Sequence, residues 1–192
     1  TGTHYLGGKL EVLSPPLHFD FKQLRLDPAE VRRTCRRLGW QNIAAFHTRQ
    51  PIHRPQFAMT LEAMRKANAN LLVLPSVGMA PPGDFDHYTR VRCYRSVADH
   101  YPPDSQLLNL LPLAMRLAGP LEALLHAIIA RNFGATHFIV GPGHGAPGRG
   151  GDGKFYADNA AKELLEKARE ELGLEILPFE EMVYLPFEDE FR

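Results

Sequence analysis

The chain has 192 residues, which is enough for one domain with a sizeable hydrophobic core. Apolar residues make up 44% of the sequence, so extensive disorder is excluded. Lysine plus arginine and aspartate plus glutamate both number 22, and this balance excludes a charge-driven attraction of the whole chain to nucleic acid or to an anionic membrane.

Residues 1–27 contain Gly7-Gly8 and Pro15-Pro16 between short apolar stretches. We expect them to form a lead-in segment that joins a preceding domain, and because the chain starts at Thr1 without a methionine we expect a longer parent polypeptide. Asp27 followed by proline is typical of a helix start, with the aspartate as the cap. The domain proper is therefore predicted over residues 28–192.

From residue 43 onward, apolar runs of strand length alternate with longer helical patterns. The predicted strands cover residues 43–46, 71–74, 107–111, 137–140 and 174–177. The predicted helices cover residues 28–38, 57–68, 88–100, 120–132 and 158–172. This order predicts an α/β fold, a Rossmann-like domain with a mainly parallel sheet and helices on both faces. Such sheets bind ligands at the carboxyl ends of their strands, near a topological switch point.

Residues 47–56 leave one predicted strand and lead into a helix. They contain two histidines, two arginines and a threonine, and the N–H groups at a helix N-terminus add partial positive charge. This combination favours a site for an oligophosphate or another oxyanion. The alternative is a basic surface turn that binds no ligand.

Residues 141–153 form a glycine-rich loop after another predicted strand. Glycine lets the backbone approach a ligand closely, and His144 is the side chain of this loop that can titrate near neutral pH. The position after a strand favours a binding loop, with a plain linker as the alternative.

Other polar residues give weaker signals. Asp84 and Asp86 are expected to cap the next helix or to be solvated, with metal binding as the alternative. A zinc site built from His47, His53 and His144 is not expected, because the i, i+6 spacing of the first two does not suit a helical pair of ligands. No metal site is therefore predicted.

Two features indicate a cytoplasmic protein. Cys35 and Cys93 show no Cys-x-x-Cys spacing, so we expect free thiols, as in a reducing compartment. No apolar run approaches the length of a membrane span, and no signal-peptide pattern is present. Neither a membrane nor a nucleic-acid partner is expected.

At its two polar loops the sequence resembles the ATP sulfurylases, also called sulfate adenylyltransferases. That family carries Gln-Thr-Arg-Asn-Pro-x-His-x-x-His, matched here from His47 to Gln56, and Gly-Arg-Asp-His-Ala-Gly-Pro-Gly, matched from Gly141 to Gly148. Shorter matches lie at residues 83–94, 111–120, 137–141 and 182–184. The resemblance covers nearly the whole chain and is highly specific.

The resemblance implies a nucleotidyltransferase of sulfate assimilation, in which sulfate attacks the α-phosphorus of ATP to give adenylyl sulfate and pyrophosphate. Mg²⁺ is implied as the cofactor that accompanies ATP, and the task of the protein is to position two anions and offset their charge. A homo-oligomer is also implied, and an adenylylsulfate kinase domain fused in the same polypeptide is a further expectation.

The resemblance also assigns site residues. Four residues take catalytic roles, and these are Thr48, Arg49, His53 and His144. The residues implied to bind the substrates are His47, Arg49, Gln50, Gln56, Gly141, Gly145, Ala146, Met182 and Val183.

Several positions depart from the family motifs. His47 and Gln50 stand where the family has Gln and Asn, Gln56 replaces the second His, and Pro142 and Gly143 replace Arg and Asp. Loss of one oriented donor at such a site typically lowers the rate about 10²–10³-fold.

Three hypotheses follow from these departures. The first is a working adenylyltransferase in which Arg54 or Arg149 replaces a missing cation. The second is a catalytically degenerate domain that acts as a scaffold or regulator for a fused adenylylsulfate kinase. The third is a related nucleotidyltransferase that uses a different oxyanion.

Overall fold

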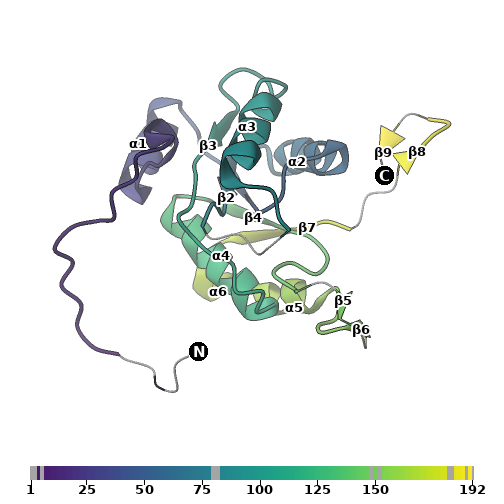
Figure 1. Ribbon diagram of the computed structural model, residues 1–192. Helices are drawn as coiled ribbons and strands as arrows, with labels where there is room; N and C mark the ends of the chain where they lie inside the picture. Colours follow the sequence, from purple (N-terminus) through teal and green to yellow (C-terminus); the bar gives the residue numbers. More distant parts are fainter. Residues whose placement is uncertain are drawn as a thin grey trace.

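The computed structural model describes residues 4, 7–78, 83–147, 149–150, 153–180, 184–188 and 190–191. Its centre is a parallel sheet of β1 (Ile43–Thr48), β2 (Asn70–Pro75), β3 (Gln106–Leu108), β4 (His137–Val140) and β7 (Glu175–Pro178). The strands lie in the order β3-β2-β1-β4-β7 (Figure 1). The predicted α/β fold with a parallel sheet is confirmed.

Helices and short hairpins complete the described chain. The helices are α1 (Pro28–Arg37), α2 (Arg54–Ala67), α3 (His87–Ala98), α4 (Pro120–Asn132), α5 (Ala160–Lys167) and α6 (Arg169–Leu172), with a 3-10 helix at Lys22–Leu24. The hairpins pair β5 (Arg149–Gly150) with β6 (Gly153–Lys154), and β8 (Tyr184–Leu185) with β9 (Glu190–Phe191). None of the described helices has the length and apolar character needed to cross a membrane.

Strand β1 has a parallel neighbour on each side. It pairs with β2 from Ile43 opposite Asn70 onward, and with β4 through Ala44 opposite His137. The chain moves outward from β1 through β2 to β3, and then returns to build β4 and β7 on the other side. The direction of winding therefore reverses between β1 and β4, which makes the crevice at their carboxyl ends the expected ligand site.

Alternate residues of the strands pack into two hydrophobic cores, one on each face of the sheet. Ala45 and Phe138 pack in one core with side chains from α1, α4, α5 and α6. Phe46 and Ile139 point the other way and pack with α2 and α3. Figure 1 shows α2 and α3 above the sheet and α4, α5 and α6 below it. Helices therefore cover both faces of the sheet, as predicted. The ends of the strands stay uncovered by these helices.

The start of α1 agrees with the prediction from Asp27. Its carboxylate accepts a hydrogen bond from the backbone N–H of Glu30, and the Glu30 side chain accepts one from the backbone N–H of Asp27. This capping box satisfies two N–H groups that a helix start leaves unpaired. Both cysteines are free thiols, with Cys35 buried and Cys93 half-buried.

Several predicted boundaries are wrong. Strand β1 continues to Thr48 rather than ending at residue 46, and α3 ends at Ala98 rather than at residue 100. Helix α2 begins at Arg54 rather than at residue 57, because Pro55 fits the first turn of a helix. Strand β3 ends at Leu108 rather than at residue 111. The helix predicted over 158–172 starts at Ala160 and divides into α5 and α6 at Ala168.

The segment before α1 has two parts. Residues 7–19 run away from the domain (Figure 1), and Leu10 and Leu13 are 91% and 92% exposed. Further along, the carbonyl of Leu24 accepts a hydrogen bond from the backbone N–H of Leu110 at 2.7 Å. The Asn109 side chain also exchanges two hydrogen bonds with the backbone of Leu26. The stretch just before α1 is therefore part of the folded body.

Candidate functional site

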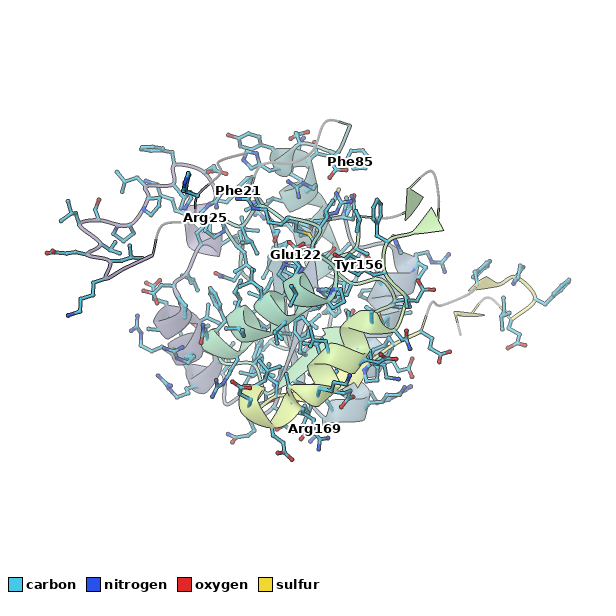
Figure 2. All side chains as sticks on the ribbon, turned by 90° about the horizontal axis from the view of Figure 1, so that it is seen from below. Phe21, Arg25, Phe85, Glu122, Tyr156 and Arg169 are labelled. Atoms are coloured by element: carbon cyan, nitrogen blue, oxygen red, sulfur yellow. The ribbon has the colours of Figure 1, made fainter. Side chains whose placement is uncertain are left out.

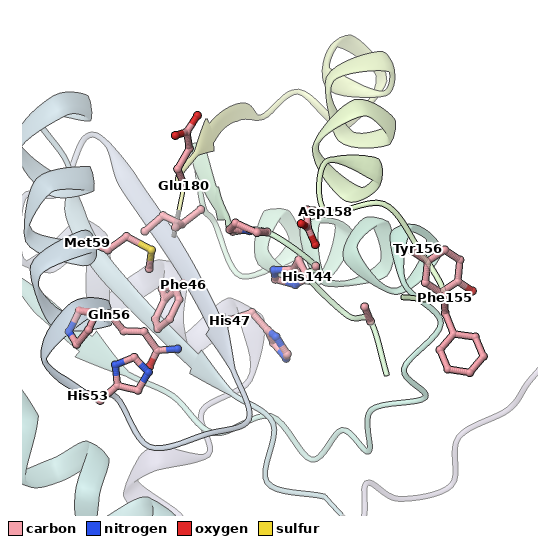
Figure 3. Close-up of a pocket in the computed structure, with 16 residues that line it drawn as sticks. Phe46, His47, His53, Gln56, Met59, His144, Phe155, Tyr156, Asp158 and Glu180 are labelled. Carbon is pink, nitrogen blue, oxygen red and sulfur yellow. The ribbon is translucent and has the colours of Figure 1, made fainter. Parts of the chain in front are cut away.

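A pocket of about 710 Å³ opens at the carboxyl ends of β1 and β4 (Figure 3). One wall is formed by His53 and Gln56 at the start of α2, and the facing wall by the loop from Gly141 to Ala146. Asp158 lies at the rim. This volume falls within the range of about 300–1,000 Å³ that is usual for small-molecule sites.

The turn after β1 is closed by Thr48. Its hydroxyl donates to the carbonyl of Gln50 at 3.0 Å and accepts from the Gln50 backbone N–H at 3.1 Å. The Tyr94 hydroxyl donates to the same carbonyl at 2.9 Å. Thr48 is 7% exposed and does not line the pocket. These contacts indicate that Thr48 holds the conformation of the turn after β1.

Arg49 is turned toward Asp84 and does not line the pocket. The two side chains form an ion pair, and the Gln50 side-chain amide lies 3.5 Å from the other carboxylate oxygen of Asp84. The Arg49 side chain is 32% exposed. Asp84 thus has an ion-pairing role, whereas Asp86 caps α3 by accepting from the Thr89 backbone N–H.

A buried guanidinium supports this loop from behind. Arg90 is 3% exposed, and its Nη1 donates to the carbonyls of Arg49 and Ser76 at 3.0 and 2.9 Å. Arginine stays charged when buried, so these two carbonyls partly offset its desolvation. Arg90 therefore fixes the backbone that carries Arg49.

The start of α2 forms the more polar wall of the pocket. His53 is the N-cap residue, but its side chain makes no capping hydrogen bond. The Oε1 atom of Gln56 is buried without a hydrogen-bond partner among the described residues. Figure 3 shows both side chains at the pocket wall. A ligand that accepts hydrogen bonds fits this wall, because the first turn of a helix offers unpaired N–H groups and partial positive charge.

The glycine-rich loop after β4 is tightly folded against α4. Gly145 has φ +74°, and a Cβ there would lie 2.8 Å from the carbonyl oxygen of Gly119. The Gly145 carbonyl in turn accepts from the Gly119 backbone N–H at 2.9 Å. Only glycine fits such a close approach with a positive φ. This packing turns His144 inward.

His144 meets two other imidazoles below the pocket. Its Nε2 lies 3.0 Å from Nδ1 of His126, which belongs to α4. The ring of His126 stacks on that of His47, with centroids 3.6 Å apart and planes 23° apart. Nε2 of His47 forms a 2.7 Å hydrogen bond with Oγ of Ser76. A His cluster therefore links β1, α4 and the glycine loop; we define it as His47, His126 and His144.

Burial keeps the His cluster neutral. Burial lowers the pKa of His126 to about 4. Burial, helped by the neighbouring His126, lowers the pKa of His144 to about 3, and the same two causes with His144 hold the pKa of His47 well below its usual value. At neutral pH each ring has one N–H donor and one lone pair. The cluster can therefore bind an anion or a metal but carries no positive charge.

The structure brings together part of the predicted site. The predicted residues that line the pocket are His47, His53, Gln56, Gly141, His144 and Ala146. Thr48, Arg49 and Gln50 lie beside it in the β1 turn, and Gly145 packs behind His144 on α4. Met182 and Val183 lie outside the described residues.

Sequence reasoning missed three polar residues of this region. Glu122 lies in the first turn of α4 (Figure 2) and His126 in the middle of this helix, and both are buried. Asp158 lines the pocket. The i, i+4 spacing of Glu122 and His126 was an available signal, because it places both on one helix face. Asp158 gave no signal, since only the fold brings it to the pocket.

Comparison with known proteins identifies relatives over nearly the whole chain. The sequence model of the ATP-sulfurylase family matches residues 22–192. A sulfate adenylyltransferase of Neurospora crassa is 49% identical over 189 residues, which are 98% of this chain and 33% of that protein. One of Schizosaccharomyces pombe is 47% identical over 192 residues, which are 100% of this chain and 39% of that protein. The chain thus spans about a third of the length of these relatives.

Two solved structures share the fold. A hexameric APS kinase from Thiobacillus denitrificans matches with a TM-score of 0.74 and 33% identity, over 92% of this chain and 32% of that one. The pantothenate synthetase of Thermus thermophilus matches with a TM-score of 0.50 and 14% identity, over 81% of this chain and 61% of that one. The second match supports the fold alone.

Proposed function

The chain belongs to the ATP-sulfurylase family, and from this premise we propose that it binds Mg-ATP in the pocket and transfers the adenylyl group to sulfate. One observation carries the proposal. The N-terminal turn of α2 and the glycine loop face each other across a pocket at the switch point between β1 and β4. Such a crevice suits a nucleotide, with its phosphates at the helix N-terminus.

The wall at α2 would take the phosphates. The N–H₂ group of the Gln56 amide can donate to a phosphate oxygen, whereas its buried Oε1 is an acceptor and would need a donor such as a water molecule or a nucleotide hydroxyl. His53 stands beside it at the helix cap, with its imidazole toward the pocket. His144 faces them as a neutral imidazole that can donate one hydrogen bond. These donors would orient the triphosphate for in-line attack.

Mg²⁺ would enter with ATP. Asp158 and Glu180 are the acidic residues among those that line the pocket, and carboxylate oxygens are ligands that Mg²⁺ accepts alongside phosphate oxygens and water. When bound, the ion offsets charge on the phosphates. We therefore assign the two carboxylates to the metal side of the nucleotide.

The proposed step conserves atoms and charge. A sulfate oxygen forms a bond to the α-phosphorus while the bond from that phosphorus to the bridging oxygen of pyrophosphate breaks. The electron pair of the broken bond leaves with pyrophosphate, and adenylyl sulfate remains. The residues of the chain act by holding the two anions in line, and hydrogen bonds to the leaving oxygens supply most of the effect.

The position of Arg49 favours a second candidate, a domain that binds nucleotide without turnover. Arg49 is paired with Asp84 outside the pocket, and the pKa of His144 is lowered to about 3, so that its imidazole is uncharged at neutral pH. A pocket that lacks these positive charges would offset the charge of the transition state poorly. Such a domain would serve as a scaffold or regulator in a longer protein.

The wider setting of the chain is also a proposal. A fused adenylylsulfate kinase and a homo-oligomer both find support in the hexameric APS kinase of which the chain matches about a third. A cytoplasmic location remains a prediction from the sequence. Use of an oxyanion other than sulfate would give the same pocket a different substrate.

Two measurements on one preparation test the proposal. Calorimetry with ATP and Mg²⁺ reports binding, and a coupled assay reports pyrophosphate release with and without sulfate. We expect binding and sulfate-dependent release, both weakened by His53→Ala and unchanged by His100→Ala, a change of an exposed residue in the turn that follows α3. Binding without release would favour the second candidate, and release driven by molybdate or selenate but not by sulfate would favour another oxyanion. Absence of binding would contradict both candidates.

A further inference from the structure

The His cluster has the composition and the spacing of a metal site. One ring nitrogen from each of His47, His126 and His144 lies within 4.8 Å of the other two. Nδ1 of His126 and Nε2 of His144 are 3.0 Å apart. Two nitrogens bound to one tetrahedral zinc ion, each at about 2.0–2.1 Å, are about 3.3 Å apart. Because the ring of His126 stacks on that of His47 with planes 23° apart, one of these two rings must turn before the lone pairs of both can meet a single ion.

The surroundings of His126 favour the tautomer with the proton on Nε2. Its Nε2 is buried without a hydrogen-bond partner among the described residues, and lies 3.7 Å from Oε1 of Glu122. The Glu122 carboxylate accepts from the backbone N–H groups of Arg116 and Ala118 at 2.7 and 2.8 Å, so it is fixed in place. A carboxylate at this position favours the proton on Nε2. The lone pair of Nδ1 then accepts a hydrogen bond from Nε2 of His144 in the metal-free chain, and a metal ion would take the place of that proton.

His47 is oriented in a similar way. Its Nε2 is hydrogen bonded to Oγ of Ser76, which leaves Nδ1 as its second nitrogen. Metal-binding histidines usually bond through their other nitrogen to a carboxylate, a carbonyl or another polar group that fixes the ring. Glu122 for His126 and Ser76 for His47 are two such groups.

We propose that His47, His126 and His144 form a binding site for a divalent transition-metal ion, with Zn²⁺ as the best fit, and that its open coordination position faces the pocket. Three imidazoles suit zinc and similar ions, whereas Mg²⁺ prefers oxygen ligands. His47 and His144 line the pocket floor, so the ion lies within reach of a pocket ligand. Three protein ligands with a free fourth position are typical of catalytic zinc sites.

Metal binding would displace the proton shared between His126 and His144. Their facing nitrogens are 3.0 Å apart, and this proton would move to the other nitrogen of the His144 ring, which keeps both rings neutral. A bound cation would also place positive charge below a pocket from which Arg49 is turned away. The inference goes beyond the proposed adenylyl transfer and does not depend on it.

Metal titration of the intact chain tests the site without nucleotide. The chain is stripped with EDTA, and Zn²⁺ is then added in a calorimeter and Co²⁺ in a spectrophotometer. We expect one Zn²⁺ per chain and the intense visible bands of four-coordinate Co²⁺. His47→Gln removes one ligand while keeping a polar side chain, and should weaken Zn²⁺ binding about 100-fold or more. His100→Gln changes an exposed histidine outside the cluster and should leave the affinity unchanged.

The second variant, His126→Asn, needs a control for folding. His126→Asn should abolish the Co²⁺ bands, and circular dichroism reports whether it folds, because His126 is fully buried. If it does not fold, His47→Gln decides. Equal Zn²⁺ affinity of the wild type and His47→Gln would overturn the proposal, as would the absence of Zn²⁺ binding by the wild type. Neither outcome bears on ATP binding, which is measured without transition metal.

Discussion

The ion pair between Arg49 and Asp84 holds the Arg49 guanidinium outside the pocket. Both side chains are partly exposed, at 32% and 21%. A pair of this exposure is worth about 1 kcal/mol or less. A bound oxyanion could therefore compete with Asp84 for the guanidinium. The ion pair would then lower the affinity of the site for an anion slightly.

Removal of the Asp84 charge tests this competition. Asp84→Asn should lower the Kd for Mg-ATP or for sulfate by about 3–5-fold, because about 1 kcal/mol of pairing energy no longer opposes the release of Arg49. Asp99→Asn is the matched control, since Asp99 is exposed at the end of α3. Calorimetry at low and at high salt measures both. An unchanged Kd would mean that Arg49 does not reach the ligand.

The His cluster should make stability depend on pH. Burial lowers the pKa of His126 to about 4 and that of His144 to about 3, whereas both titrate near 6.5 in the unfolded chain. As pH falls from about 6.5 to 4, the unfolded chain binds protons that the folded chain does not. The free energy of unfolding should then fall by up to about 1.4 kcal/mol per pH unit for each histidine, and be fully retained above pH 7.

Urea unfolding between pH 4.5 and 7.5, with EDTA present, measures this slope. His47→Gln should flatten it, because one buried neutral imidazole is removed from the folded state. A slope that is equal in the wild type and the variant would show that His47 is not part of the acid sensitivity. His100→Gln, on the surface, should behave as the wild type.

At the scale of elements, the glycine loop depends on its contact with α4. Gly145→Ala should destabilise the fold by about 1–3 kcal/mol, because a Cβ at φ +74° would meet the Gly119 carbonyl at 2.8 Å. Gly143→Ala is the matched control. Its φ is +61°, but a Cβ there would meet only Ala146 at 3.9 Å, so its loss should be smaller. Thermal unfolding of both variants checks the order, and equal losses would contradict it.

The start of a helix or strand was predictable where a short stretch of sequence was sufficient to define it. Asp27 before Pro28 located the start of α1, and the buried run at 43–46 located β1. The division at Ala168 was not predictable, because the helical pattern runs through it. The location of the pocket was predictable, because two polar loops follow strands in the sequence. The contact between His126 and His144 was not predictable, because it depends on how closely Gly145 packs against α4.

At the scale of the whole molecule, the segment before α1 divides into an independent and an integrated part. Deletion of residues 1–17 should leave the midpoint of thermal unfolding unchanged, because Leu10 and Leu13 contribute almost no burial. Deletion of residues 1–26 should cost at least about 2 kcal/mol, since Leu24 and Leu26 lose their hydrogen bonds to Leu110 and Asn109. Equal midpoints for both truncations would contradict this division.

The central position of β1 has a consequence for biosynthesis. Its first partner strand begins at Asn70, but its second begins at His137, so one edge of β1 stays unpaired until the residues from His137 onward have been made. Closing so long a loop is entropically slow, and an open apolar strand edge invites association between nascent chains. Yield in a cell should therefore depend on chaperone supply and on growth temperature more than on the stability of the finished fold.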